Sequence, residues 1–272
     1  MIKIAMCQLL IEGGEPIRNF NRAKEFIIEA SKKKANLIIF PECSDFGWTH
    51  PSYKKAKTIP GKYSFYFQEL AKKNKIDICI GLTEKLNNNF FNSAIYINKK
   101  GLILSHYRKI NLLNEEANAY YEPGSKLEVF DSEFAKIGIS ICADNYSKSS
   151  IISHLLSRMG ADIIISPSSW TVNADNNDQN PYNQKWSSTM KEVTAIYNNT
   201  FIAVTSIGYI VGGPVEGRKM IGCSLAYKNG KQLIELNNNE VSSELKIINI
   251  TVNKNKIKKC GTELSNNISI NI

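Results

Sequence analysis

The chain has 272 residues, of which 43% are hydrophobic and 22% charged, and its formal net charge is +9. The hydrophobic content allows a sizeable core and excludes a disordered or fibrous protein. No apolar run approaches the ~18 residues that a membrane helix needs, and the N-terminal segment lacks the pattern of a signal peptide. We therefore expect a globular protein with neither feature.

Short β-branched runs alternate with longer amphipathic segments through the first part of the chain. Residues 3–10 and 36–42 favour strands, and the second run is nearly all apolar, as in a strand buried on both faces. Between them, apolar residues recur at helical spacing from Ile17 to Ala30. The alternation continues with a predicted helix and a predicted strand at residues 62–74 and 76–82.

The rest of the chain adds hairpin signals to this pattern. Residues 98–101 and Asn229-Gly230 are turn sequences between apolar runs. The hairpin strands are expected at 93–98, 102–107, 224–227 and 231–236. Other strands are expected at 127–130, 135–141, 161–167, 199–207 and 245–252, and helices at 149–159 and 183–197. Strand–helix–strand units mixed with hairpins predict one α/β domain with mixed sheets and outer helices.

The positive charge comes mostly from lysine, because only five of the 34 basic residues are arginine. Recognition of bases and phosphates favours arginine forks. Lysine runs such as residues 32–34 are typical of a solvated surface. We therefore expect neither a nucleic-acid partner nor a membrane partner.

Six cysteines and three histidines are present, but no C-x-x-C or H-E-x-x-H spacing occurs. Several cysteines lie inside apolar strand-like runs, where a free thiol behaves as a small hydrophobic group. The composition predicts no metal site, and it favours a reducing, cytoplasmic compartment.

Three candidate catalytic side chains follow predicted strands, at the edge where α/β sheets gather their functional groups. They are Glu42, Lys109 and Cys142. Cys142 is expected on a strand-to-helix turn, where the helix dipole would lower the thiol pKa. Taken singly, each residue has an ordinary structural interpretation, as a capping carboxylate, a surface lysine or a core cysteine.

Five sequence segments, which occur in a fixed order along the chain, are stronger evidence of function than any single residue. They are F-P-E at 40–42, Y-R-K-I-N-L at 107–112, P-G at 123–124, G-I-S-I-C-A-D at 138–144 and G-A-D-I-I-I-S-P-S-S-W at 160–170. Together they resemble the nitrilase superfamily of carbon–nitrogen hydrolases, in its amidase-like branch. The resemblance implies a single domain over 1–272, with a core of about 1–252 and a C-terminal tail of about 253–272.

The resemblance also implies a four-layer αββα sandwich of two mixed β-sheets and a set of catalytic roles. Glu42 would be the general base, Lys109 the cation that stabilises the tetrahedral intermediate, and Cys142 the nucleophile. A second, supporting glutamate is expected between the lysine segment and the Pro-Gly pair. Glu115 and Glu116 both qualify there, and we favour Glu116.

The implied activity is hydrolysis of a small linear amide or carbamoyl compound through an acyl-thioester on the cysteine, with release of ammonia or an amine. It requires no metal and no organic cofactor. The backbone N–H of Ala143 would complete an oxyanion hole with Lys109. Tyr120, Asn145 and Trp170 are candidate substrate-binding residues, and the loops 45–48 and 207–219 are further candidates for specificity.

The chain departs from the usual family pattern at Ala143, where an aromatic residue is frequent, and at Asn111, where histidine is frequent. Because of these two departures, a particular substrate cannot be carried over from the family. Other interpretations are a nitrile-hydrolysing enzyme, a catalytically silent binding protein, and a Cys–His hydrolase that uses His106 or His154. The resemblance further suggests a homodimer or a larger homo-oligomer.

Overall fold

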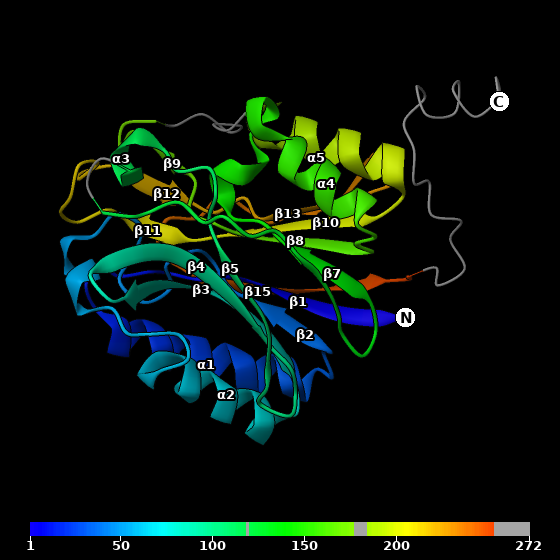
Figure 1. Cartoon of the computed structure of the whole chain (residues 1–272), viewed down its shortest axis with the longest axis horizontal. Coiled ribbons are helices and arrows are strands. Elements are labelled where there is room, and N and C mark those ends of the chain that lie inside the picture. Colours follow the sequence, from blue (N-terminus) through cyan, green and yellow to red (C-terminus); the bar gives the residue numbers. More distant parts are fainter. Residues whose placement is uncertain (118–119, 177–183, 253–272) are drawn as a thin grey trace.

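The computed structural model describes residues 1–117, 120–176 and 184–252, and the predicted tail at 253–272 lies outside them. One mixed sheet is built mainly from the first half of the chain (Figure 1). Its spatial order is β15 (Glu244–Ile250), β1 (Ile2–Gln8), β2 (Leu37–Ile39), β3 (Asp77–Leu86), β4 (Asn89–Ile97) and β5 (Ile103–Arg108). The strands β1, β2 and β3 are mutually parallel, and the outer ones are antiparallel to their neighbours.

The second mixed sheet comes from the other half of the chain. Its spatial order is β14 (Lys231–Glu235), β13 (Leu225–Lys228), β10 (Thr200–Thr205), β8 (Ile163–Ser168), β7 (Lys136–Ile139) and β6 (Val129–Asp131). A small third sheet, also in spatial order, contains β11 (Ile207–Tyr209), β12 (Lys219–Ile221) and β9 (Thr171–Val172). The two large sheets face each other, with β1 against β10 and β3 against β8.

Helices cover the outer face of each large sheet, so the fold is a four-layer αββα sandwich, as predicted (Figure 1). The helices α1 (Pro16–Lys32) and α2 (Lys62–Asn74) cover the first sheet. The helices α4 (Ile151–Arg158) and α5 (Gln184–Tyr197) cover the second, and the short α3 (Asn114–Ala117) lies at one end. Among the described residues, no helix has both the length and the apolar composition required to cross a membrane.

Strand alternation explains how one strand can serve two core layers. In β1, Ile4 and Met6 belong to the core that includes the space between the sheets, whereas Ala5 and Cys7 pack under α1 and α2. Successive side chains of a strand point to opposite faces, so a strand buried on both faces must be apolar throughout. This is the pattern that the nearly all-apolar runs of the sequence predicted.

Both predicted hairpins are present. β4 and β5 meet at the turn that contains Gly101, and β13 and β14 meet at Asn229 and Gly230. The φ values of Asn229 and Gly230 are 52° and 71°, as a tight hairpin turn of this type requires.

Three features differ from the prediction. The strands expected at 76–82 and 93–98 are longer and form a further hairpin through Asn87, whose φ is 55°. The strand expected at 199–207 ends at Thr205, and the chain then crosses into the third sheet. The third sheet itself was not predicted, because strands of two or three residues are too short to show a periodicity.

Candidate active site

Cys142 lies on a strained turn that follows β7. It begins a 3-10 helix of residues Cys142–Asn145, and its φ is 45°. Residues other than glycine seldom adopt this left-handed conformation, and such strain concentrates at functional sites. The Cys142 N–H donates to Ser166 Oγ at 3.3 Å, and the residue is only 2% exposed. The turn therefore holds the thiol inside the protein, at the carboxyl end of β7.

Asn145 ties this turn to its surroundings. Its Oδ1 accepts hydrogen bonds from Ser140 Oγ at 2.9 Å and Ser153 Oγ at 2.8 Å, and its Nδ2 donates to Ser166 Oγ at 2.8 Å. The sequence suggested that Asn145 binds substrate. Both ends of its amide are engaged within the protein, and a role of Asn145 in substrate binding stays a prediction.

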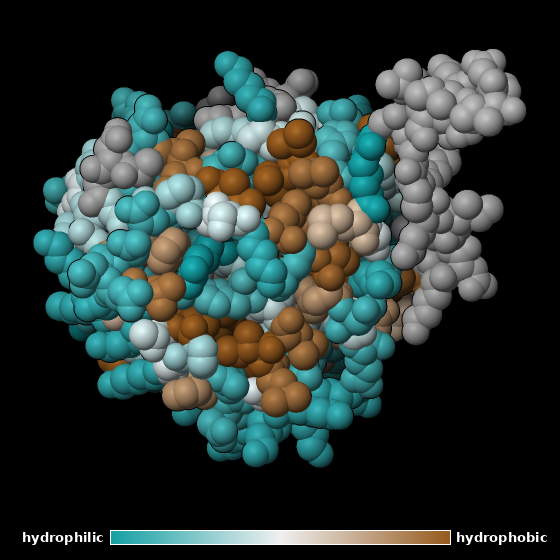
Figure 2. All heavy atoms as spheres, viewed as in Figure 1, coloured by the Kyte–Doolittle hydropathy of each residue, from teal (hydrophilic) through white to brown (hydrophobic). Residues whose placement is uncertain are grey.

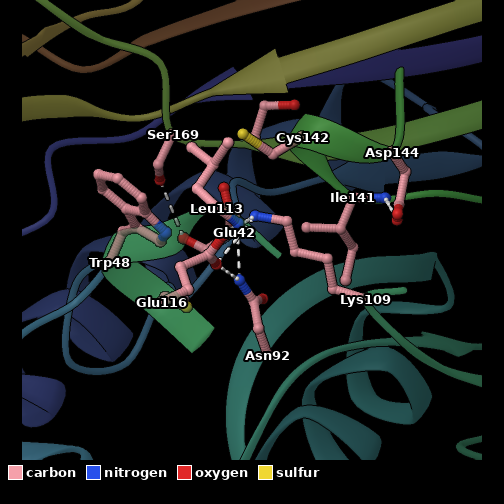
Figure 3. A network of polar contacts seen from close by, with 12 residues as sticks. Glu42, Trp48, Asn92, Lys109, Leu113, Glu116, Ile141, Cys142, Asp144 and Ser169 are labelled. Carbon is pink, nitrogen blue, oxygen red and sulfur yellow. Dashed lines mark hydrogen bonds and ion pairs between the residues drawn. The ribbon is translucent and has the colours of Figure 1, made fainter. Parts of the chain in front are cut away.

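Asp144 joins the cysteine turn to the segment that carries the lysine. One of its oxygens accepts hydrogen bonds from the Ile141 N–H at 2.9 Å and the Tyr107 hydroxyl at 2.7 Å. The other accepts one from the Asn111 N–H at 2.8 Å. Since Tyr107 is in β5 and Asn111 lies just beyond it, a single buried carboxylate connects the two sheets beside Lys109 (Figure 3).

The residues around Glu42 follow β2 in the chain. They hydrogen-bond to β3 beyond the last regular pair of these two strands. The Gly81 N–H donates to Pro41 O at 3.0 Å, and the Ser44 N–H donates to Gly81 O at 2.8 Å. A Cβ on Gly81 would lie 2.5 Å from the Cα of Glu42, closer than any side chain allows. A glycine at position 81 is therefore required for the two segments to approach each other.

Lys109, directly after β5, and Glu116, in α3, place their side chains in contact with each other. The Lys109 N–H donates to Asn92 O at 2.8 Å, which continues the pairing of β5 with β4. Glu116 is fully buried, and its Oε2 accepts a hydrogen bond from the Leu113 N–H at 2.9 Å. Glu115 is only half-buried, so the structure favours Glu116 as the supporting glutamate.

These side chains form one buried polar network (Figure 3). The Lys109 amine donates to Glu42 Oε1 at 2.9 Å and to the Glu116 oxygens at 2.7 and 2.9 Å. The Asn92 amide donates to Glu42 Oε1 at 2.6 Å and to Glu116 Oε1 at 2.9 Å. Glu42 Oε2, by contrast, has no hydrogen-bond partner in the described part of the chain. One oxygen of Glu42 is thus fixed and the other is available.

Two effects set the pKa values in this network. One is burial, and the other is the imbalance of two carboxylates against one amine. Burial raises the pKa of Glu42, and the nearby Lys109 opposes this effect without cancelling it. Burial acts to lower the pKa of Lys109, but the carboxylates of Glu116 and Glu42 outweigh it and raise that pKa well above its usual range. The lysine therefore remains a cation, while Glu42 is made more basic than an exposed glutamate.

The thiol pKa differs from the sequence-based expectation. Burial raises the pKa of Cys142 well above its usual range, and the charge of Glu42 raises it further, against a smaller lowering by Lys109. The predicted helix-dipole effect is wrong because α4 begins only at Ile151, after two short 3-10 helices. The resting thiol is therefore protonated at neutral pH and needs a base.

The other predicted substrate-binding residues surround this centre. Ala143 follows the cysteine and is 3% exposed. Trp170 is buried and stacks on Trp186 with ring centroids 4.5 Å apart. The half-buried Tyr120 contacts Tyr53 edge-on at 4.5 Å. Their roles in substrate binding stay predictions.

The histidines are engaged elsewhere. His106 Nε2 lies 2.8 Å from Glu84 Oε2, and His154 Nδ1 lies 3.1 Å from the Tyr197 hydroxyl. His50 Nδ1 accepts a hydrogen bond from the Ser52 N–H and caps the 3-10 helix Pro51–Lys55. These contacts weigh against a Cys–His pair with Cys142.

Sequence reasoning missed Asn92, which contacts both glutamates, and Ser169, whose hydroxyl lies 3.4 Å from Glu42 O. Asn92 ends an asparagine- and phenylalanine-rich run, N-N-N-F-F-N, that has no distinctive signal. Ser169 lies within the P-S-S-W segment that was already part of the resemblance, and it could have been found there.

Comparison with known proteins decides the family. The model of the carbon–nitrogen hydrolase family matches residues 3–253. The chain belongs to this family. The resemblance drawn from the motifs is thereby confirmed, and the buried glutamates, lysine and cysteine form the polar centre of a carbon–nitrogen hydrolase fold.

Curated relatives and solved structures add detail. A nitrilase from Pyrococcus abyssi is 34% identical over 173 residues, which cover 61% of this chain and 64% of that protein. An omega-amidase from Xenopus laevis is 27% identical over 184 residues, which cover 62% of this chain and 64% of that protein. The chain thus spans 64% of the length of each of these two relatives, which is less than two thirds. An amidase from Nesterenkonia sp. has a TM-score of 0.78 at 18% identity, with coverages of 98% and 96%.

Proposed function

We propose that this protein is an amidase-type hydrolase that cleaves the carbon–nitrogen bond of a small linear amide or carbamoyl compound. The observation that carries the proposal is the asymmetry of Glu42, whose Oε1 is held by Lys109 and Asn92 while Oε2 has no hydrogen-bond partner among the described residues. Glu42 also lies near enough to Cys142 for its charge to act on the thiol. A base with one fixed and one available oxygen is what a protonated thiol requires. Similarity to omega-amidases supports amides as the substrate class.

The first step transfers the thiol proton of Cys142 to Glu42 Oε2. The sulfur lone pair forms a bond to the amide carbon, and the C=O π electrons move onto the oxygen. The charge on Lys109 and the backbone N–H of Ala143 stabilise this oxyanion, and loss of one such donor typically costs about 3 kcal/mol.

The second step breaks the carbon–nitrogen bond. The oxyanion electrons re-form the carbonyl while Glu42 gives its proton to the departing nitrogen, which leaves as ammonia or an amine. The acyl group remains on the Cys142 sulfur as a thioester. Glu42 then takes a proton from water, the resulting hydroxide adds to the thioester, and the acid and the free thiol are released.

Glu116 and Asn92 act on this cycle through Glu42 and Lys109. Glu116 accepts the Lys109 amine with both oxygens, so it aims the cation and sustains its charge. Asn92 donates to Glu42 Oε1 and thereby leaves Oε2 for proton transfer. Both are positioning residues in this proposal.

A nitrile is the second candidate substrate, favoured by the similarity to a nitrilase from Pyrococcus abyssi. The same thiol would add to the nitrile carbon, and the same base would activate water. Both substrates give a carboxylic acid and ammonia, an amide with one water molecule and a nitrile with two. The two cases are therefore separated by which compound is consumed, the amide or the nitrile.

The test is ammonia release from a panel of linear amides, carbamoyl amines and nitriles. Cys142→Ala and Glu42→Gln should abolish hydrolysis of every active compound. Cys79→Ala is the matched control, since Cys79 is another fully buried thiol in the core, in β3, and its loss should leave turnover intact. An active Cys142→Ala protein would exclude the thioester mechanism. Binding without turnover by the unaltered protein would favour a silent binding protein.

We also propose that the protein forms a homodimer or a larger homo-oligomer. One stripe along α4 and its C-cap exposes Ile151, Leu155 and Met159, with 64%, 43% and 46% of each residue accessible. Figure 2 shows apolar side chains gathered on the face where α4 lies. Sedimentation of the unaltered protein and of Leu155→Glu tests this: a monomer in both cases would exclude it.

A reducing, cytoplasmic location remains part of the proposal. All five cysteines in the described part of the chain are unpaired and buried, as in proteins that keep their thiols reduced. Fractionation of cells that produce the protein would locate it directly.

A further inference from the structure

The base segment, residues 42–49, is held in a strained conformation. Cys43, directly after Glu42, has a φ of 45°, and Thr49 has a φ of 60°. Residues other than glycine seldom adopt this left-handed conformation unless the surrounding structure holds them there. The whole segment is buried, and its Trp48 lies beside Glu42 (Figure 3). The conformation of the base segment therefore depends on contacts with other parts of the chain.

The side chain of Asp45 provides one such contact, to β3. Its Oδ2 accepts a hydrogen bond from the Thr83 N–H at 2.9 Å, and its Oδ1 accepts one from the Thr83 hydroxyl at 3.0 Å. Oδ1 also accepts a hydrogen bond from the Phe46 N–H at 2.8 Å. The backbone bond from the Ser44 N–H ends on Gly81, two residues before Thr83. The carboxylate thus continues the attachment of the base segment to β3 where the backbone bonds stop.

Thr83 connects this attachment to the base itself. It lies opposite Asn92 in the ladder of β3 and β4, and opposed residues of antiparallel strands project to the same face. Asn92 in turn donates to Glu42 Oε1 at 2.6 Å. Glu42 is therefore held twice from this part of the sheet, by Asn92 at its carboxylate and by Asp45 through the backbone that carries it.

The charge of Asp45 has no counter-ion in the part of the chain that the structure describes. Its side chain is fully buried, and none of the ion pairs formed there includes it. Its titratable neighbours there are the Cys43 thiol, the Tyr63 hydroxyl of α2 and the Tyr121 hydroxyl, none of which is a cation. The helix α1 contributes the neutral Asn19, which donates to Asp45 O at 2.8 Å. The charge is therefore stabilised by neutral hydrogen-bond donors.

Protonation weakens the contacts of this carboxylate. Burial raises the pKa of Asp45 to about 7, although the hydrogen bonds from Phe46 and Thr83 act to lower it. The two backbone N–H groups can only donate, and a hydrogen bond to an ionised acceptor is roughly twice as strong as a neutral one. A neutral Asp45 therefore holds the base segment less tightly, and the change occurs near neutral pH.

We propose that Asp45 is a positioning residue for the base: its ionised form holds the base segment against β3, and its protonation loosens this hold and slows hydrolysis. The inference rests on the proposed function, in which Glu42 accepts the thiol proton. It adds a dependence on pH that is separate from the titration of Glu42, because the proton on Asp45 takes no part in the reaction.

The experiment compares kcat/KM of the unaltered protein and of Asp45→Asn on the best amide of the panel, from pH ~5.5 to pH ~8.5. Asparagine has the shape of a protonated aspartate and no charge. We expect Asp45→Asn to be at least ~10-fold slower at the alkaline end, with the loss in kcat rather than KM, and the two proteins to converge at the acidic end. The ratio of the two profiles cancels the titration of Glu42, which both proteins share. A ratio that does not change with pH would indicate a merely structural role and overturn the inference.

Asp77→Asn is the matched control, because Asp77 is another buried aspartate of β3, at the opposite end of the strand from Thr83. It accepts hydrogen bonds from the Tyr96 hydroxyl and the Lys99 N–H, away from the base segment. Its ratio to the unaltered protein should stay near one throughout. Thr83→Val keeps the carboxylate of Asp45 and removes one of its donors, so the rise of kcat/KM should move to higher pH. A rise that stays in place would contradict the proposal.

Hydrogen exchange tests the attachment without turnover. At pH ~8.5 the Thr83 amide should exchange at least ~10-fold faster in Asp45→Asn than in the unaltered protein, and at pH ~5.5 the two rates should be similar. Equal rates at both pH values would overturn the inference even in an active enzyme. If no amide is hydrolysed, the proposed function fails, whereas the exchange rates still decide whether Asp45 holds the base segment.

Discussion

Arg108 and Lys109 are neighbours in the sequence, yet each serves a different carboxylate cluster. Arg108 binds both oxygens of Glu84 at 2.6 and 2.8 Å, and Glu84 also accepts hydrogen bonds from Ser93 and His106. Lys109 binds one oxygen of Glu42, and the other has no hydrogen-bond partner in the part of the chain that the structure describes. Both glutamates are almost inaccessible to solvent, so burial alone does not distinguish them.

The difference lies in how completely each carboxylate is satisfied. Burial acts to raise the pKa of Glu84, but the hydrogen bonds from Arg108 and His106 outweigh it and lower that pKa to about 2. Burial raises the pKa of Glu42, and Lys109 does not compensate for it. A fully bonded carboxylate is a structural anchor, whereas a buried one with a free oxygen is suited to proton transfer.

The largest effect is expected from Lys109→Gln. In the proposed mechanism it removes the cation that would stabilise the oxyanion, and it leaves Glu42 and Glu116 facing each other, so kcat/KM should fall at least ~10³-fold. Steady-state kinetics on the best substrate of the panel measure it. Near-normal turnover in this variant would mean that the two clusters do not differ in function.

Arg108→Gln should lower the stability of the protein and leave its catalytic rate nearly unchanged. It leaves the buried Glu84 without its main partner, so the free energy of unfolding should fall by about 3 kcal/mol. Because Arg108 does not enter the Lys109 network, kcat should remain within severalfold of its original value. Urea unfolding and kinetics of the same preparation provide the comparison. A large loss of kcat with unchanged stability would refute it.

Asn92→Leu tests how one hydrogen bond to Glu42 affects its proposed role as a base. The hydrogen bond from Asn92 lowers the pKa of Glu42, so its loss should raise that pKa further. Glu42 must be ionised to accept the thiol proton, and the acidic limb of the kcat/KM profile should therefore move to higher pH, with a ~10–100-fold loss of rate. Lower activity with no movement of the limb would indicate a merely structural role.

The smallest effect concerns acid stability. The pKa of Glu84 is lowered from 4.5 to about 2 in the folded state, so the unfolded chain binds more protons between these values. The stability that Glu84 contributes is present above pH ~4.5 and is lost as the pH falls toward 2, by about 2 kcal/mol since its partners are partly exposed. Unfolding of the unaltered protein should show a steeper pH dependence than that of Glu84→Gln. Equal slopes would contradict the assignment.

Local sequence patterns were sufficient to predict much of the fold and to single out Glu42, Lys109 and Cys142 as candidates. The apolar runs and the Asn229-Gly230 turn predicted strands and hairpins that the structure contains. Glu42, Lys109 and Cys142 each follow a strand, and parallel strands bring their carboxyl ends to one edge. Asn92 was missed because its run has no distinctive pattern, and its role depends on the pairing of β4 with β5.

The sequence by itself determined the order of strands and helices, the family and the segments that meet at the site, because these depend on periodicity, turn chemistry and motif spacing. Tertiary structure decided the rest. It placed Glu116 rather than Glu115 in the buried network, left one oxygen of Glu42 without a hydrogen-bond partner among the described residues, and raised rather than lowered the pKa of Cys142. These outcomes depend on burial and on contacts between residues distant in sequence, which no local pattern encodes.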